Sequence, residues 1–242
     1  MRILGVRVDE YTMDGALAKL SGILEEPQRQ SRLAQVVTIN PEGVMLAKED
    51  PALRQIVEES PLVTADGSGI LWAADKLKHP MPERVPGIDL LERLCAEAAR
   101  KDWTVYLLGA KPGIADQAAV ELSGRYPGLR IIGTENGYFR DREEKVVSTI
   151  RAAQPDILFA ALGMPFQEHW LYQHREELGC RVAVGVGGSF DVIAGTVKRA
   201  PKLWQRLRLE WLWRLLSDPK RWRRYLAIPR FMHAVSKERK AK

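Results

Sequence analysis

The chain has 242 residues, of which 45% are hydrophobic and 28% are charged, and its formal net charge at pH 7 is +6. This length and composition predict one substantial core with room for an appendage. Two cysteines, Cys95 and Cys180, lack the spacing of metal ligands and exclude a framework of several disulfides, so a reducing compartment is expected.

The first ten residues become charged too early for a secretory signal. No run reaches the roughly 18 uninterrupted apolar residues that a spanning helix needs. We therefore expect a cytoplasmic protein.

Charge divides the sequence into two parts. Residues 196–242 contain 15 Lys and Arg against 3 Asp and Glu, whereas residues 1–195 contain 22 against 28. Four of the seven tryptophans also lie in the C-terminal part. This shift predicts an acidic body over residues 1–195 and a basic, Trp-rich helical appendage over residues 196–242.

Apolar runs rich in β-branched residues alternate with helical patterns along the body. The clearest runs are residues 35–39, 103–108, 156–162 and 181–184. Each is followed by Gly or Pro, and Pro41 and Pro165 stand where the next helices are expected to begin. Runs this apolar suit strands covered on both faces, so the sequence predicts an α/β fold with a mainly parallel sheet and flanking helices.

Small and polar residues follow these runs, at the end of the sheet where open α/β folds bind ligands. The segment T-A-D-G-S-G at 64–69 contains Asp66, and Thr38 and Asn40 follow the strand before it. Each position also has a local interpretation, because Gly ends strands and Asp or Ser caps helices. Taken alone, Asp66 is ordinary turn chemistry.

Nine motifs then follow one another along the chain. They are T-x-N at 38–40, A-D-G-S-G at 65–69, P-E-R-V-P-G-x-D-L at 82–90, V-Y-L-L-G at 105–109, Y-P-G-L-x-I-x-G at 126–133, G-Y-F at 137–139, L-G-M-P-F-Q-E-x-W at 162–170, G-V-G-G-S-F-D at 185–191 and A-G-x-V-K-R-A-P at 194–201. In this order they resemble the WecG/TagA/CpsF family of bacterial glycosyltransferases, over nearly the whole chain. Within the family they resemble the TagA-like enzymes of wall teichoic acid synthesis.

The resemblance implies a Rossmann-like fold and a UDP-sugar donor. No cofactor is expected. It implies transfer of N-acetylmannosamine to N-acetylglucosamine on undecaprenyl diphosphate, and hence a peripheral enzyme on the inner face of the plasma membrane. Relatives that use N-acetylmannosaminuronic acid or other hexoses leave the sugar open. Whether the chain forms a homo-oligomer is open as well.

Inverting sugar transfer needs a base for the acceptor hydroxyl, and the resemblance raises Asp66 to first candidate. The flanking Gly67 and Gly69 are expected to let substrate approach the backbone. Thr38 and Asn40 are expected either to orient the acceptor or Asp66, or to cap the helix that follows Ile39.

The leaving diphosphate needs positive charge. No Asp-x-Asp triplet and no His/Cys cluster is present in the sequence, so we expect no metal. Arg84 is the first candidate for this charge, with a surface ion pair as its local interpretation, and Arg199 is the second candidate. In the tail, Arg214, Arg221 and Arg224 are further candidates.

For the nucleotide, Tyr138 offers a ring to uracil, Gln167 an amide, and Asp191 a carboxylate for ribose hydroxyls or the uracil N–H. A rim aromatic, a first-turn residue and a helix cap are the respective local alternatives. The strand-end glycines expected beside the nucleotide sugar are Gly109, Gly163 and Gly187.

One residue departs from the family pattern, because Phe166 stands where relatives often have lysine. Two other function classes fit the sequence less well. The sequence pI of about 9.4 and a tail of Arg and Trp suggest nucleic-acid binding, but the positive charge is confined to the tail, so no nucleic acid is expected. A dehydrogenase is disfavoured, since G-V-G-G-S lacks the G-x-G-x-x-G spacing.

In the tail, tryptophan and leucine recur at helical spacing between residues 203 and 216, and Asp218-Pro219 ends the pattern. A second basic helix is expected over about 220–227. Basic residues beside the tryptophans predict a helix lying on an anionic membrane surface. The alternative is a helix that packs on the body.

Overall fold

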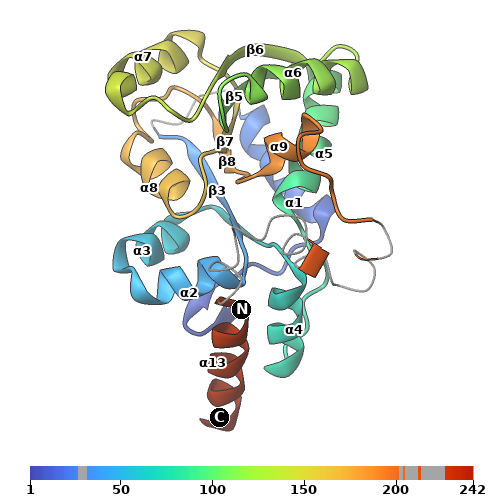
Figure 1. The fold of residues 1–242 in the computed structure, drawn as a ribbon, viewed down its shortest axis with the longest axis vertical. Helices are drawn as coiled ribbons and strands as arrows, with labels where there is room; N and C mark the ends of the chain where they lie inside the picture. The colour runs from blue at the N-terminus through green and yellow to red at the C-terminus, as the bar shows by residue number, and fades with distance from the viewer. Residues whose placement is uncertain (27–31, 202–203, 205–211, 214–226, 242) are drawn as a thin grey trace.

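The computed structural model of the chain describes residues 1–26, 32–201, 204, 212–213 and 227–241. At its centre lies a six-stranded sheet in the order β4-β3-β8-β7-β5-β6, in which every pairing is parallel (Figure 1). The strands are β3 (Ala34–Ile39), β4 (Leu62–Ala65), β5 (Thr104–Gly109), β6 (Arg130–Glu135), β7 (Ile157–Ala161) and β8 (Val182–Gly185). The predicted α/β fold with a parallel sheet is confirmed.

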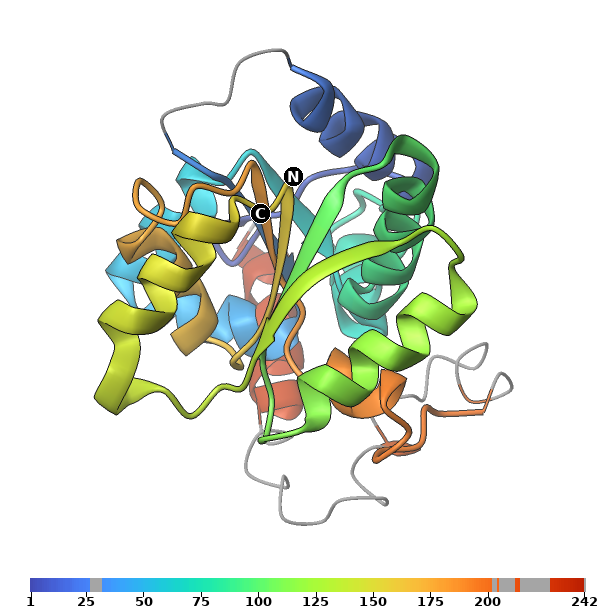
Figure 2. The same ribbon diagram turned by 90° about the horizontal axis from the view of Figure 1, so that it is seen from above.

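Helices cover both faces of this sheet (Figure 2). One face carries α1 (Met13–Glu25), α5 (Gly87–Lys101), α6 (Ile114–Arg125) and α9 (Ser189–Ile193). The other carries α2 (Pro41–Glu49), α3 (Pro51–Glu59), α7 (Glu143–Ala153) and α8 (Phe166–Gln173), with α4 (Ser68–Lys76) beside α2 and a short 3-10 turn, η1 (Arg140–Arg142), before α7. Strand side chains alternate between the two cores, so Val36 packs on the first and Val37 on the second. Burial on both faces explains the continuous apolar runs.

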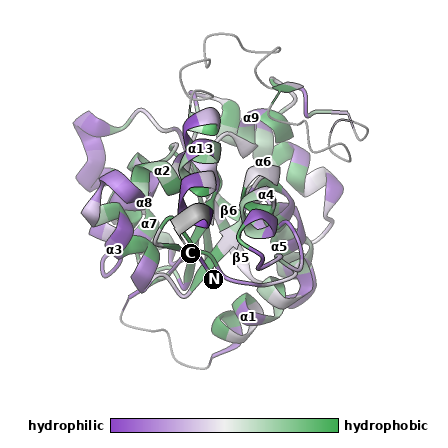
Figure 3. Ribbon diagram, turned by 90° about the horizontal axis from the view of Figure 1, so that it is seen from below, coloured by the Kyte–Doolittle hydropathy of each residue, from purple (hydrophilic) through white to green (hydrophobic). Residues whose placement is uncertain are grey.

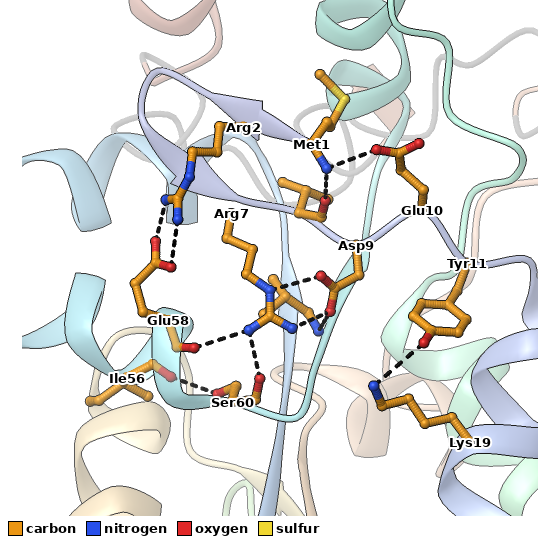
Figure 4. Close-up of polar contacts among 12 residues, drawn as sticks. Met1, Arg2, Arg7, Asp9, Glu10, Tyr11, Lys19, Ile56, Glu58 and Ser60 are labelled. Carbon is orange, nitrogen blue, oxygen red and sulfur yellow. Dashed lines mark hydrogen bonds and ion pairs between the residues drawn. The ribbon is translucent and has the colours of Figure 1, made fainter.

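An antiparallel hairpin precedes the sheet, formed by β1 (Arg2–Ile3) and β2 (Val6–Arg7). The guanidinium of Arg7 donates to both carboxylate oxygens of Asp9, at 2.8 and 2.7 Å, and to the carbonyl oxygens of Glu58 and Ser60 at 3.0 and 2.9 Å (Figure 4). Asp9 in turn accepts from the backbone N–H of Val63 at 3.0 Å. The hairpin is thereby fastened to the end of α3 and the start of β4.

The last described helix, α13 (Ala227–Ala241), lies between α2 and α4 (Figure 3). Its Phe231 and Val235 are fully buried in the core that also contains the hairpin. Glu238 accepts a hydrogen bond from the backbone N–H of Leu4 at 3.1 Å. Residues 227–241 therefore pack on the body, whereas the boundary at residue 196 stays a prediction.

Most of the two helices predicted in the tail falls outside the described residues. Within them, Trp204, Leu212 and Trp213 are helical. None of the described helices is long and apolar enough to cross a membrane.

Candidate active site

Asp66 directly follows β4, and its backbone N–H donates to the carbonyl oxygen of Ile39 at 2.8 Å. Its carboxylate oxygen Oδ2 accepts from the backbone N–H of Gly87, the first residue of α5, at 3.3 Å. The carboxylate thus lies at the positive end of a 15-residue helix, which favours its ionised form. The side chain is half-buried, so it is held in place and still reaches solvent.

The two glycines beside Asp66 serve different needs. Gly67 has φ +90°, a left-handed conformation that a residue with a side chain rarely adopts. At Gly69, an added Cβ would lie 2.5 Å from Cγ of Pro41. The space where a side chain of Gly69 would project is therefore filled by Pro41, and the approach of substrate to the backbone at these two glycines stays a prediction.

Thr38 and Asn40 do different things in the structure. The side-chain oxygen of Asn40 accepts from the backbone N–H of Gly43 at 2.9 Å, which confirms the helix-cap interpretation for this residue. Thr38 caps no helix: its buried hydroxyl donates to the carbonyl oxygen of Gly185 at 2.8 Å and joins the ends of β3 and β8. A Cβ on Gly87 would lie 3.1 Å from Oγ1 of Thr38, so this hydroxyl sits directly beneath the start of α5.

Arg84 and Arg199 lie in two segments that meet the start of α5. Arg84 lies in the segment that runs into this helix, and the next residue, Val85, donates its N–H to the carbonyl oxygen of Ala65 at 2.9 Å, beside Asp66. Arg199 reaches the same helix from the other direction, with its guanidinium 2.5 Å from Oδ1 of Asp89. The two side chains of this ion pair are 25% and 31% exposed, and Asp89 lies in the first turn of α5.

Asp89 was not among the residues predicted from the sequence. The signal was present, because P-E-R-V-P-G-x-D-L places an acid in the first turn of the expected helix. What the motif does not reveal is that this acid meets an arginine 110 positions later in the chain.

The segment that carries Arg199 is tied to α9. The hydroxyl of Thr196 and the N–H of Val197 donate to the carbonyl oxygen of Asp191 at 2.9 and 3.0 Å. The tail thus leaves the body beside the predicted site. Arg214, Arg221 and Arg224 lie outside the described residues, and their roles stay predictions.

The predicted nucleotide residues follow the remaining strands. Tyr138 follows β6 and is 65% exposed, with its ring available for stacking. The adjacent Gly137 donates its N–H to the carbonyl oxygen of Ala110 at 2.8 Å, which draws this segment over the end of β5. The carboxylate of Asp191 is half-buried in the first turn of α9, and since Gly188 is the N-cap, Asp191 is not the cap of this helix.

Gln167 is 2% exposed, and its whole amide is used inside the protein. Its oxygen accepts from the backbone N–H groups of Gly163 and Gly187, both at 3.1 Å, and its nitrogen donates to Glu168 at 2.8 Å. The direct contact with a nucleotide that was predicted for this amide stays a prediction. The bonds found here link the loops after β7 and β8.

The three strand-end glycines also differ. A Cβ on Gly109 would lie 2.5 Å from the carbonyl oxygen of Ala161, so this glycine is required by the neighbouring strand. Gly163 and Gly187 have φ of +84° and +52° and open space where a side chain would project. The contact with a nucleotide sugar that was predicted for these two glycines stays a prediction.

The chain matches the glycosyl transferase WecG/TagA/CpsF family over residues 1–242. The chain belongs to this family. A relative from Bacillus spizizenii, named N-acetylglucosaminyldiphosphoundecaprenol N-acetyl-beta-D-mannosaminyltransferase, is 37% identical over 212 residues, which are 88% of this chain and 82% of the relative. A relative of the same name from Staphylococcus aureus is 34% identical over 238 residues, 98% of this chain and 92% of its own.

The predicted enzyme class, a glycosyltransferase, is thereby confirmed, and it is favoured over the nucleic-acid-binding and dehydrogenase alternatives. Where this family member has Phe166, the ring is 36% exposed, and the guanidinium carbon of Arg140 lies 5.5 Å from the ring centroid. Phe166 itself is uncharged, but the cation of Arg140 lies beside it.

The described part of this family member contains no group of three or more His, Cys, Asp and Glu side chains that could hold a metal. The contact found at the carboxylate of Asp66 is with the start of α5, and Arg199 pairs with Asp89 in the first turn of the same helix. In the strand order β4-β3-β8-β7, the end of β4 at Asp66 and the loop after β7 at Gly163 are three strand spacings of about 4.8 Å apart, or roughly 14 Å. An extended nucleoside diphosphate spans such a distance.

Proposed function

We propose that the chain transfers N-acetylmannosamine from UDP-N-acetylmannosamine to N-acetylglucosaminyl-diphospho-undecaprenol, in the synthesis of wall teichoic acid or a related surface polymer. The observation that carries this proposal is the position of Asp66, a carboxylate at the start of α5 with arginine-bearing segments on two sides. The names of the relatives from B. spizizenii and S. aureus supply the substrates.

In the proposed reaction, Asp66 accepts the proton of the acceptor hydroxyl while the hydroxyl oxygen attacks the anomeric carbon. The bond from that carbon to the diphosphate breaks on the opposite face, so the configuration inverts. The hydrogen bond from Gly87 fixes the direction of the carboxylate. Thr38 lies directly beneath Gly87, and its hydrogen bond to Gly185 supports the start of α5.

The leaving diphosphate gains negative charge, and in the proposed reaction the start of α5, Arg84 and Arg199 stabilise this charge without a metal ion. In the structure, the carboxylate of Asp89 forms an ion pair with the guanidinium of Arg199. A diphosphate that enters the site is expected to compete with this carboxylate for the same donors.

At the other end of the donor, the exposed ring of Tyr138 is proposed to stack on uracil, and the carboxylate of Asp191 to accept from the ribose hydroxyls. Gly163 and Gly187 leave space for the nucleotide between them. Gln167 holds these two loops in register.

A polyprenyl-linked acceptor requires work at a membrane surface, and we infer that residues 196–242 bind the inner leaflet. The described end of the tail supports this inference. While Phe231 and Val235 of α13 turn into the body, Arg230, Lys237 and Arg239 remain exposed. Basic side chains near an anionic surface contribute about 1 kcal/mol each.

The test is incubation with a panel of UDP sugars and a lipid-linked N-acetylglucosamine acceptor, with the product identified by mass. A product larger by one N-acetylhexosamine, formed from UDP-N-acetylmannosamine alone, supports the proposal. A product formed only from the uronic acid donor would reassign the sugar, and no product from any UDP sugar would reject the proposed donor class.

A further inference from the structure

Glu168, the third residue of α8, is a buried carboxylic acid beneath the site. It is 1% exposed, and Oε1 accepts from Nε2 of Gln167 at 2.8 Å. Its other oxygen, Oε2, has no hydrogen-bond partner among the residues that the structure describes. Gln35 of β3 donates to the backbone carbonyl oxygen of Glu168 at 3.1 Å, which fixes the helix against the sheet.

The acid determines which way the amide of Gln167 points. Oε1 of Glu168 accepts from the NH₂ end of the amide, and this bond turns the oxygen end away. That oxygen then faces two backbone donors, Gly163 N–H and Gly187 N–H. The reversed amide would place its NH₂ group against both N–H groups and leave them buried without acceptors.

The same pair lies against the last residue of β8. A Cβ on Gly185 would lie 2.5 Å from Nε2 of Gln167 and 3.0 Å from Oε1 of Glu168. The carbonyl oxygen of Gly185 accepts from Thr38. A continuous set of buried contacts therefore runs from Glu168 to the Gly163 and Gly187 loops and, through Gly185, to Thr38 beneath the start of α5.

We propose that Glu168 is a positioning residue, which holds the Gly163 and Gly187 loops in the geometry that binds the UDP moiety by fixing the orientation of Gln167. This inference rests on the proposed UDP-sugar donor. Glu168 itself touches neither substrate. Its part is to present one acceptor oxygen, at one place, to Nε2 of Gln167.

Two substitutions of similar size separate this role from general packing. Glu168→Gln keeps an acceptor oxygen without a charge, whereas Glu168→Leu fills the space without an acceptor. We expect Glu168→Gln to bind UDP within about 3-fold of the unsubstituted chain by calorimetry, and Glu168→Leu to bind at least about 10-fold more weakly. Ile150→Ala, a buried change on α7, is the control for lost stability and is expected to keep full UDP affinity.

A second measurement covers the case in which Glu168→Leu does not fold. Glu168→Asp keeps the acid but withdraws its oxygens by one methylene. Hydrogen exchange followed by mass spectrometry is expected to show faster exchange of peptides covering residues 162–167 and 185–190 in this variant, with other peptides unchanged. Glu168→Gln is expected to leave both peptides protected.

The proposal is overturned if a folded Glu168→Leu binds UDP normally, if Gln and Leu weaken binding equally, or if Glu168→Asp changes neither exchange nor affinity. Failure of the proposed function looks different. In that case the unsubstituted chain itself does not bind UDP, while the exchange experiment still reports whether Glu168 holds the two loops.

Discussion

Asp66 and Gly87 are 21 positions apart in the chain, and the carboxylate of one accepts the backbone N–H of the other at 3.3 Å. This contact sets the end of β4 against the start of α5. It converts a turn residue into a carboxylate held at a helix N-terminus, where an anion is stabilised and a proton acceptor keeps a fixed direction.

The first prediction concerns this carboxylate. Asp66→Asn keeps an oxygen that accepts from Gly87 but removes the basic group, so folding and UDP binding are expected to persist while turnover falls by about 10²-fold or more. Steady-state kinetics and calorimetry measure the two effects. Asp102→Asn, at the opposite end of α5, is the matched control with normal turnover. Near-normal turnover of a folded Asp66→Asn would return Asp66 to a turn role.

The second prediction concerns the diphosphate. Arg84→Ala and Arg199→Ala are each expected to weaken UDP binding by about 10-fold and to change uridine binding little, because uridine lacks the phosphates. Calorimetric titration with both ligands measures the difference. Arg93→Ala, an exposed change on the same helix, is the control. Equal losses for UDP and uridine would place the arginines outside the diphosphate site.

The third prediction concerns metals. In the proposed mechanism arginines and a helix N-terminus stabilise the leaving group, so turnover is expected to be unchanged in excess chelator. The assay compares chelated enzyme with and without added Mg²⁺ or Mn²⁺. Activity that disappears with chelator and returns with a divalent ion would contradict the metal-free mechanism.

The fourth prediction concerns pH and folding. Burial raises the pKa of Glu168 to about 7, above its usual value of about 4.5. The folded state therefore keeps a proton that the unfolded chain loses, and stability falls as pH rises from about 4.5 to 7. Glu168→Gln has no carboxyl group to ionise at this position. Its free energy of unfolding minus that of the unsubstituted chain is therefore expected to increase by about 2 to 3 kcal/mol between pH 5 and pH 8.

Urea unfolding of both proteins at the two pH values measures this change. Comparing the two chains at each pH cancels the contributions of all other titrating groups. A stability difference that does not vary with pH would show that Glu168 is ionised in the folded protein at pH 5.

The fifth prediction concerns the tail. Because Phe231 and Val235 are part of the body core, deleting residues 196–242 would expose apolar surface and confuse the result. Replacing Arg214, Arg221 and Arg224 with Gln leaves α13 intact. We expect weaker sedimentation with anionic vesicles and also lower turnover on a water-soluble acceptor.

The two readouts separate the alternatives. Lost vesicle binding with unchanged soluble turnover would make the tail an anchor only. Unchanged vesicle binding would remove these arginines from the membrane contact. A parallel substitution with Gln of three exposed basic residues of α13, Arg230, Lys237 and Arg239, shows whether this helix contributes to the same surface.

The sequence by itself determined the parallel α/β sheet, because strands buried on both faces must be continuous apolar runs, as residues 157–161 are. It also located the strand ends that precede Asp66, Gln167 and Asp191, since polar residues that follow such runs fall at the carboxyl ends of the strands. The helix that follows Asn40 was predictable for a local reason, the spacing of a cap and a proline.

Only the tertiary structure decided which of these residues meet. The contacts of Asp66 with Gly87, of Arg199 with Asp89, and of Thr38 with Gly185 join segments 21, 110 and 147 positions apart. No local propensity encodes such contacts, because they depend on the order in which six strands are laid side by side. The docking of α13 and the burial of Glu168 have the same origin. Phe231 and Val235 of α13, like Glu168, are buried by elements distant in the sequence, so their environment exists only after the sheet has assembled.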